Sequence, residues 1–202
     1  MKKILALVAI LSAFSLTSCG NSNTAAKAGD VTITQTELQA SVDEILAERA
    51  KIDTSQMQLA TGAELNRGEL QFRVVVAIYD EIAKELKIEI TKTELSDLRA
   101  ELIAQIGGEE NLASQLVAAQ IPPSELDIYV RTVLTSQKLS EMLISSGITE
   151  DVVGEKMSQL IVAKSKEMGI EINPMYGTWN PETALIEETD SASDSVVNPE
   201  QG

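Results

Sequence analysis

Residues 63–86 read AELNRGELQFRVVVAIYDEIAKEL, and this segment is central to the predicted fold. Its apolar side chains recur at helical spacing; they are Leu65, Leu70, Phe72, Val75, Ile78, Tyr79, Ile82 and Leu86. This spacing is typical of an α-helix with one wide apolar face. The sequence therefore predicts a long helix at the centre of a hydrophobic core, with the other elements packed around it.

Three similar segments predict the starts of further helices. They are ITQTEL at 33–38, ITKTEL at 90–95 and ITEDVV at 148–153. In the first two, a Thr stands three residues before a Glu, which is the spacing of a capping box at a helix N-terminus. The third segment keeps Thr149 but has no Glu at the matching position. We expect three separate helix starts and not a tandem repeat.

Glycine and proline divide the rest of the chain into helices. Gly107 and Gly108 follow an apolar-periodic segment and are expected to end its helix. Pro122 and Pro123 break the chain and are expected to start another helix, because proline is tolerated in a first helical turn. The last helix is expected to end near Gly169.

Two short stretches alternate apolar and polar residues, as strands do. They are 30–33 and 170–179. A lone strand is not stable, so the simplest arrangement pairs the two. The expected fold class is mainly α: a compact multi-helix domain closed by a small two-stranded β pairing of its N- and C-terminal ends.

The N-terminus has the features of an export signal. Lys2 and Lys3 precede an apolar run at 4–14, which is shorter than the roughly 20 residues of a membrane-spanning helix. The run leads into LTSCG at 16–20, which resembles the lipobox of bacterial lipoproteins. The resemblance implies a signal peptide at 1–18 and acyl chains, palmitate among them, on Cys19. The alternative is an ordinary thiol in a secreted chain cut by the general signal peptidase.

Composition limits the function classes. Cys19 is the only cysteine, so no intramolecular disulfide can form. The chain has a net charge of −15, which becomes −17 once Lys2 and Lys3 are removed with the signal peptide. Nucleic-acid binding is disfavoured, since it needs a basic face. Attachment to the extracytoplasmic face of the cell membrane would depend on the lipid, because anionic headgroups repel this charge.

The same patterns predict four regions. A lipoprotein signal peptide at 1–18 is followed by a lipidated flexible tether at 19–29, which is small and polar. The helical domain is expected at 30–181, and an acidic disordered tail at 182–202.

The chemistry open to this chain is narrow. It has no histidine, which excludes Ser-His-Asp triads and imidazole zinc sites. The adjacent acids at 109–110 and 187–188 match no calcium loop and are expected to be solvated surface groups. No Gly-rich phosphate loop is present. We therefore expect no catalytic residues, no metal, no cofactor and no enzymatic activity.

The two ends of the helical domain carry a family resemblance. GDVTITQTEL at 29–38 and INPMYGTW at 172–179 resemble the opening and closing segments of the N-terminal chaperone domain of SurA-type and PrsA-type extracytoplasmic folding factors. Ala28 departs from the pattern, because the family usually has Asn there. The resemblance implies a holdase or foldase for exported unfolded polypeptides. The family's prolyl isomerase module has active-site histidines, so isomerase activity is not expected here.

Client binding by such a protein would use an apolar surface. The segment at 51–61 carries Ile52, Met57 and Leu59 among polar residues, and we predict that these three contact clients. Tyr176 and Trp179 are expected to pack the strands onto the helices. The alternative function is a non-enzymatic binding or assembly scaffold with one dedicated partner. A chaperone predicts a broad exposed apolar patch, and a scaffold predicts a compact one. The oligomeric state is left open.

Overall fold

A computed structural model of the chain describes residues 23–189. The predicted signal peptide at 1–18, the predicted lipid attachment site Cys19 and the last residues, 190–202, lie outside this range. The helices are α1 (Gln35–Arg49), α2 (Gly62–Leu86), α3 (Lys92–Gln105), α4 (Glu109–Ala119), α5 (Leu126–Ser145) and α6 (Glu150–Met168), with a 3₁₀ turn η1 (Pro123–Glu125) before α5. The strands are β1 (Thr24–Ala28), β2 (Val31–Thr34), β3 (Glu171–Ile172), β4 (Thr178–Asn180) and β5 (Leu185–Glu187). The mainly α fold class is confirmed.

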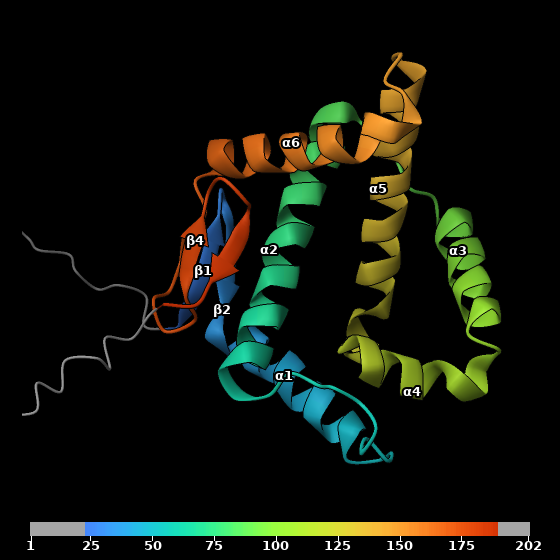
Figure 1. Cartoon of the computed structure of the whole chain (residues 1–202), viewed down its shortest axis with the longest axis vertical. Coiled ribbons are helices and arrows are strands. Elements are labelled where there is room, and N and C mark those ends of the chain that lie inside the picture. The colour runs from blue at the N-terminus through green and yellow to red at the C-terminus, as the bar shows by residue number, and fades with distance from the viewer. Residues whose placement is uncertain (1–22, 190–202) are drawn as a thin grey trace, which may run out of the picture.

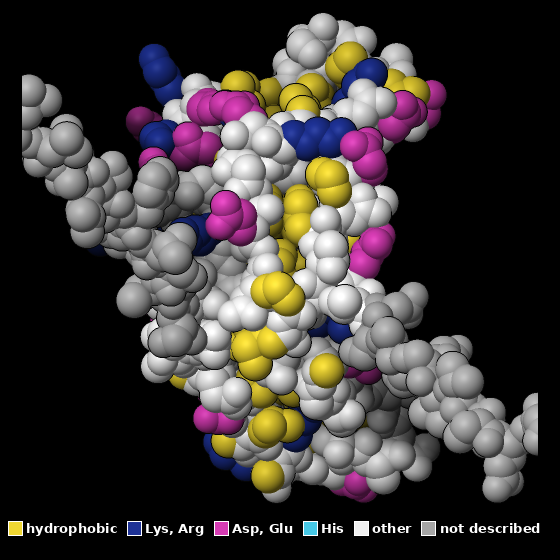
Figure 2. Space-filling view, turned by 90° about the vertical axis from the view of Figure 1, so that its left-hand side faces the viewer, with side chains coloured by type: hydrophobic (Ala, Val, Ile, Leu, Met, Phe, Trp, Pro, Cys, Tyr) yellow, Lys and Arg dark blue, Asp and Glu magenta, His cyan; other side chains and the backbone are white. Residues whose placement is uncertain are grey.

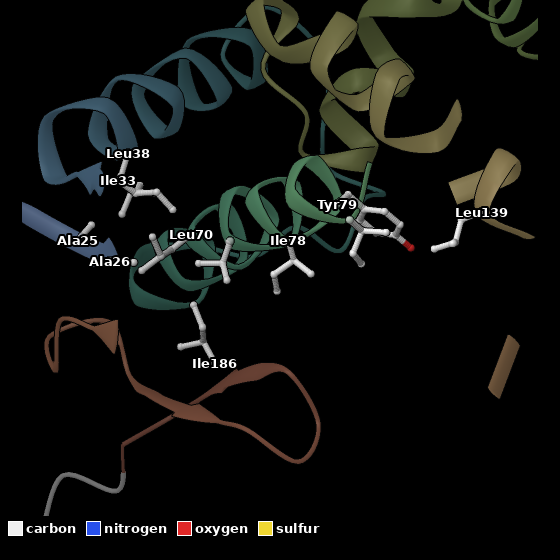
Figure 3. Packing of buried hydrophobic residues seen from close by; sticks show 11 residues of the cluster. Ala25, Ala26, Ile33, Leu38, Leu70, Ile78, Tyr79, Leu139 and Ile186 are labelled. Carbon is white, nitrogen blue, oxygen red and sulfur yellow. The ribbon is translucent and has the colours of Figure 1, made fainter. Parts of the chain in front are cut away.

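Helix α2 is the central element, as its sequence predicts. The strands pack along one flank, α5 lies along another, and α6 crosses both helices near one end (Figure 1). Ala25, Ala26, Ile33 and Leu38 approach α2 from the N-terminal segment, while Ile186 approaches it from the C-terminal segment (Figure 3). The same core reaches Leu139 on α5, and all these side chains are buried.

The helix starts follow the predicted capping pattern. Thr34 accepts a hydrogen bond from the Glu37 backbone N–H, and the Glu37 carboxylate accepts one from the Thr34 N–H at 2.9 Å. Thr91 and Glu94 repeat this reciprocal pair at the start of α3. Thr149 precedes α6 without a side-chain cap. The two Thr–Glu pairs thus fix the entry into α1 and α3 by local chemistry alone.

The prediction of a flexible tether at 19–29 is wrong for residues 24–28. Residues 24–28 form β1, which lies between β2 and β3 in a three-stranded antiparallel sheet. The expected direct pairing of the two domain ends is therefore replaced by pairing of both with β1. Ala25 and Ala28 are fully buried. Their small side chains let the strand approach α2 closely, a tertiary contact that a linker-like composition does not reveal.

The prediction of a disordered tail at 182–202 is wrong for residues 185–187. Residues 185–187 form β5, which pairs with β4, and Ile186 is buried in the main core. Tyr176 and Trp179 pack against the same core, as expected. Gly177 has φ +136°, and a Cβ there would collide with the Glu187 carbonyl oxygen, so this turn requires glycine. The acidic composition of residues 182–202 therefore does not reveal that Ile186 packs in the main core.

Candidate functional site

A groove opens where the N-terminal half of α2, the link between α4 and η1, and α5 meet. One cavity of about 390 Å³ is lined by Leu65, Glu69 and Phe72 from α2 and by Tyr129 from α5, among others. A second cavity of about 180 Å³ lies between α3, α4 and α5. The two share the lining residues Ala119, Ile121 and Tyr129, so they are adjacent cavities. We call the two cavities together the central groove.

The groove lies between two hydrophobic clusters, neither of which is the main core. The main core surrounds α2 and the strands, and a second core forms between α3, α4 and α5 around Leu98 and Val130. A third, smaller core joins Val42 and Ile45 of α1 to Leu65 of α2. Helix α5 contributes to the main and the second core, whereas α3 and α4 contribute only to the second. The larger cavity is lined by Leu65 from the third core and by Tyr129, which packs against the second.

Half-buried apolar side chains line the groove from both sides. Phe72 and Tyr129 line the larger cavity, and Ile103 and Ile106 line the smaller one. Ile103 and Ile106 on the α3 side pack into none of the three cores. These side chains are therefore available to an apolar ligand without rearrangement of the cores.

Arg49 holds one rim of the groove. It donates hydrogen bonds to the Ala60 carbonyl at 2.7 Å and to the Gln120 side-chain oxygen at 2.6 Å. Ala60 and Gln120 both line the larger cavity. Burial lowers the pKa of Arg49, and its Nε has no hydrogen-bond partner among the described residues. One side chain at the end of α1 thus ties the α1–α2 loop to the end of α4.

A buried charged cluster lies beside the groove. Arg73 on α2 donates from Nε to Glu69 at 2.9 Å and from Nη2 to Glu125 in η1 and to Ser41 on α1. Ser41 in turn donates to Glu125 at 2.5 Å. Glu69 and Glu125 are 4% and 5% exposed, so both carboxyl groups are removed from water. Burial, and then the neighbouring charge of Glu125, raises the pKa of Glu69 to about 8.

The predicted client-binding residues do not line the central groove. Ile52, Met57 and Leu59 are half-buried in the α1–α2 loop, where the Met57 N–H donates to the Thr54 carbonyl at 2.9 Å. Only the end of this loop, at Ala60, reaches the groove. The role of these three residues in client binding stays a prediction.

Comparison with known proteins leaves the family open. No protein-family model, curated protein sequence or solved structure matches this chain. Within residues 23–189, no helix is long and apolar enough to cross a membrane. The same range contains no group of three or more acidic or cysteine side chains placed to hold a metal ion.

One signal in the sequence could have pointed to the charged cluster. Glu69 occurs on the buried face of α2, four residues after Leu65 and four before Arg73. An acid on an apolar stripe with an arginine one turn later indicates a buried ion pair. The contribution of Glu125 has no such signal, because it lies 52 residues from Arg73 in the chain.

Proposed function

We propose that this protein is a membrane-anchored extracytoplasmic lipoprotein that acts as a chaperone for exported unfolded polypeptides, without isomerase activity. The central groove is its client-binding site. The observation that carries the proposal is the set of half-buried apolar side chains that faces this groove from α2, α3 and α5. Unfolded chains expose apolar side chains, and burying each one in such a groove is favourable by about 1 kcal/mol or more.

Further support comes from the two ends of the domain. The segments at 29–38 and 172–179, which resemble those of SurA-type and PrsA-type chaperone domains, lie in or next to the strands that flank α2. Both cavities of the groove are partly open to solvent, which suits clients of varied sequence better than one defined small molecule. Lipidation of Cys19 would keep this groove close to chains that emerge from the membrane.

A specific observation favours the alternative, a scaffold with one dedicated partner. The large hydrophobic side chains that are exposed come from different parts of the fold, with only Met142 and Ile144 on the same helix: Val31, Leu46, Leu86, Met142, Ile144, Leu160, Met175 and Leu185. Figure 2 shows hydrophobic side chains on one face interspersed with charged and other groups. A scattered distribution leaves the groove as the main apolar surface, which is compact and could fit a single partner.

Aggregation suppression separates the two functions. The chain lacking residues 1–19, which keeps every described residue, is added to two unrelated unfolding proteins while light scattering is followed. The chaperone proposal expects suppression of both clients. No effect on either at severalfold excess would leave the dedicated scaffold as the better account.

Matched variants test the groove itself. Replacing Ile103 and Ile106 by Ser removes apolar surface from the groove but touches none of the three cores, so we expect client affinity about tenfold weaker with unchanged stability. Leu160→Ser, at an exposed position on α6, is the control and should behave as the parent chain. Met57→Ser tests the α1–α2 loop. If Met57→Ser abolishes suppression and the Ile103/Ile106 variant does not, the client site is the loop and not the groove.

A further inference from the structure

Three segments of the chain meet at the Arg73 side chain. Its guanidinium binds Glu69 within α2, Glu125 in η1 and Ser41 in α1. Two carboxyl groups therefore share one cation. Arg73 is the only Lys or Arg within ion-pair distance of either carboxyl among residues 23–189. If both were ionised, one negative charge would be buried without compensation, at a cost of several kcal/mol.

The surrounding charged groups do not supply the missing positive charge. On α1, Glu37 also faces Arg73 and is attracted by the same guanidinium. Asp80, further along α2, has its own partner, because Arg131 on α5 lies 3.7 Å from it. Glu44 on α1 accepts hydrogen bonds from the Ser124 backbone N–H and hydroxyl. The charged groups around Glu69 and Glu125 therefore do not compensate the second negative charge of this pair.

Glu125 has one oxygen with no partner. Its Oε1 accepts hydrogen bonds from Arg73 and Ser41, whereas Oε2 is buried and has no hydrogen-bond partner. A buried carboxylate oxygen without a donor is costly. The Glu69 and Glu125 carboxyl groups bind the same Arg73 guanidinium, and the Glu69 carboxyl group becomes a hydrogen-bond donor when it carries a proton.

We propose that Glu69 and Glu125 share one proton, which Glu69 donates to the free oxygen of Glu125, and that this proton locks η1 against α2. The shared proton gives the orphan oxygen its donor and leaves one negative charge opposite the one positive charge of Arg73. The raised pKa of Glu69 agrees with this arrangement, since burial and the Glu125 charge both favour its protonated form.

The lock has a consequence for the central groove. Residues Ala119 to Pro122 line the groove, and η1 follows them directly. Glu69 itself lines the larger cavity. Loss of the proton would place two negative carboxylates against each other at this wall, so the wall should loosen at alkaline pH. This regulatory role rests on the proposed function of the groove, whereas the shared proton does not.

Unfolding as a function of pH tests the lock without any client. In the unfolded chain Glu69 has its ordinary pKa of 4.5, and in the folded chain the pKa is about 8. The folded state therefore binds more protons between these values, and stability should fall as the pH rises from about 5 to about 9. Glu69→Gln supplies an amide donor to Glu125 and keeps an acceptor for Arg73, so its urea midpoint should stay level and exceed that of the parent above about pH 8.

The control and a second measurement keep the test decisive. Glu64→Gln changes an exposed acid that lines the same cavity and should retain the parent's pH dependence. Infrared spectroscopy of the full-length chain should show a carboxylic-acid carbonyl band at neutral pH that disappears as the pH is raised past about 9. A Glu69→Gln variant with the parent's pH slope, or a parent chain without that band, overturns the proposal. Should Glu69→Gln fail to fold, the infrared band alone decides.

Discussion

The side-chain amide of Gln71 on α2 holds the backbone around Ile186 in β5. Its oxygen accepts a hydrogen bond from the Ile186 N–H at 2.7 Å, and its nitrogen donates one to the Ala184 carbonyl at 3.0 Å. The two residues are separated by 115 positions. This amide thus matches the donor and acceptor of a strand edge, and it anchors the C-terminal segment beside the central helix.

Removal of the Gln71 amide should weaken this anchor. Gln71→Ala leaves the Ile186 N–H and the Ala184 carbonyl without their partners in a part-buried position, so we expect a loss of about 1–3 kcal/mol in the free energy of unfolding. Urea unfolding followed by far-UV circular dichroism measures it. Gln137→Ala, at an exposed position on α5, should change the free energy by less than about 0.5 kcal/mol.

Two truncations should separate the ordered C-terminal segment from the residues after it. A chain ending at residue 189 keeps all described contacts and should be as stable as the parent. A chain ending at residue 181 loses buried Ile186 and Ala184, so we expect a cost of about 2 kcal/mol or more. Equal thermal midpoints for the two truncations would contradict the packing of β5 onto α2.

The first strand can be tested by a change of side-chain size. Ala25 is fully buried between the sheet and the core, so Ala25→Leu should overpack this contact and cost about 1–3 kcal/mol. Lys27→Leu, two positions along the same strand but exposed, is the matched control and should cost little. Similar unfolding free energies for both variants would mean that 24–28 behaves as a tether.

An ion pair between α3 and α5 should contribute to stability in a pH-dependent way. The Lys138 ammonium lies 2.6 Å from Glu94, and this contact, followed by hydrogen bonds from Thr91, lowers the Glu94 pKa to about 2 from 4.5. A depressed pKa stabilises the folded state above the unfolded value of 4.5, and the contribution is lost as the pH falls towards 2.

The variant Glu94→Gln removes the charge but keeps an oxygen for the helix cap. We expect it to be less stable than the parent near pH 7 and equal to it near pH 2. Thermal unfolding at a series of pH values measures the difference. Asp97→Asn, an exposed acid on the same helix, serves as the reference for general charge effects. A stability difference that is constant with pH would exclude a role for this ion pair.

The candidate site was only partly predictable. Helical periodicity indicates α2, α3 and α5, which supply most of the groove, but periodicity does not say which helices lie side by side. The sequence favours the loop at 51–61 for client binding because loop residues need not fill the core, whereas the groove lies between the second core and the small core that joins α1 to α2. The Glu69–Arg73 pair can be predicted from the sequence, because the two residues are one helical turn apart. Glu125 reaches Arg73 only in the folded chain.

Features that depend on near neighbours in the chain can be predicted from the sequence. These are the apolar face of α2, the reciprocal caps at Thr34–Glu37 and Thr91–Glu94, and the breaks at glycine and proline, all of which are set by interactions within a few residues. Three other features depend on tertiary contacts: residues 24–28 form a strand, Ile186 packs in the core, and Glu125 binds Arg73. Alanine and acid-rich segments have little preference of their own, so their conformation depends on the surface that distant residues offer them.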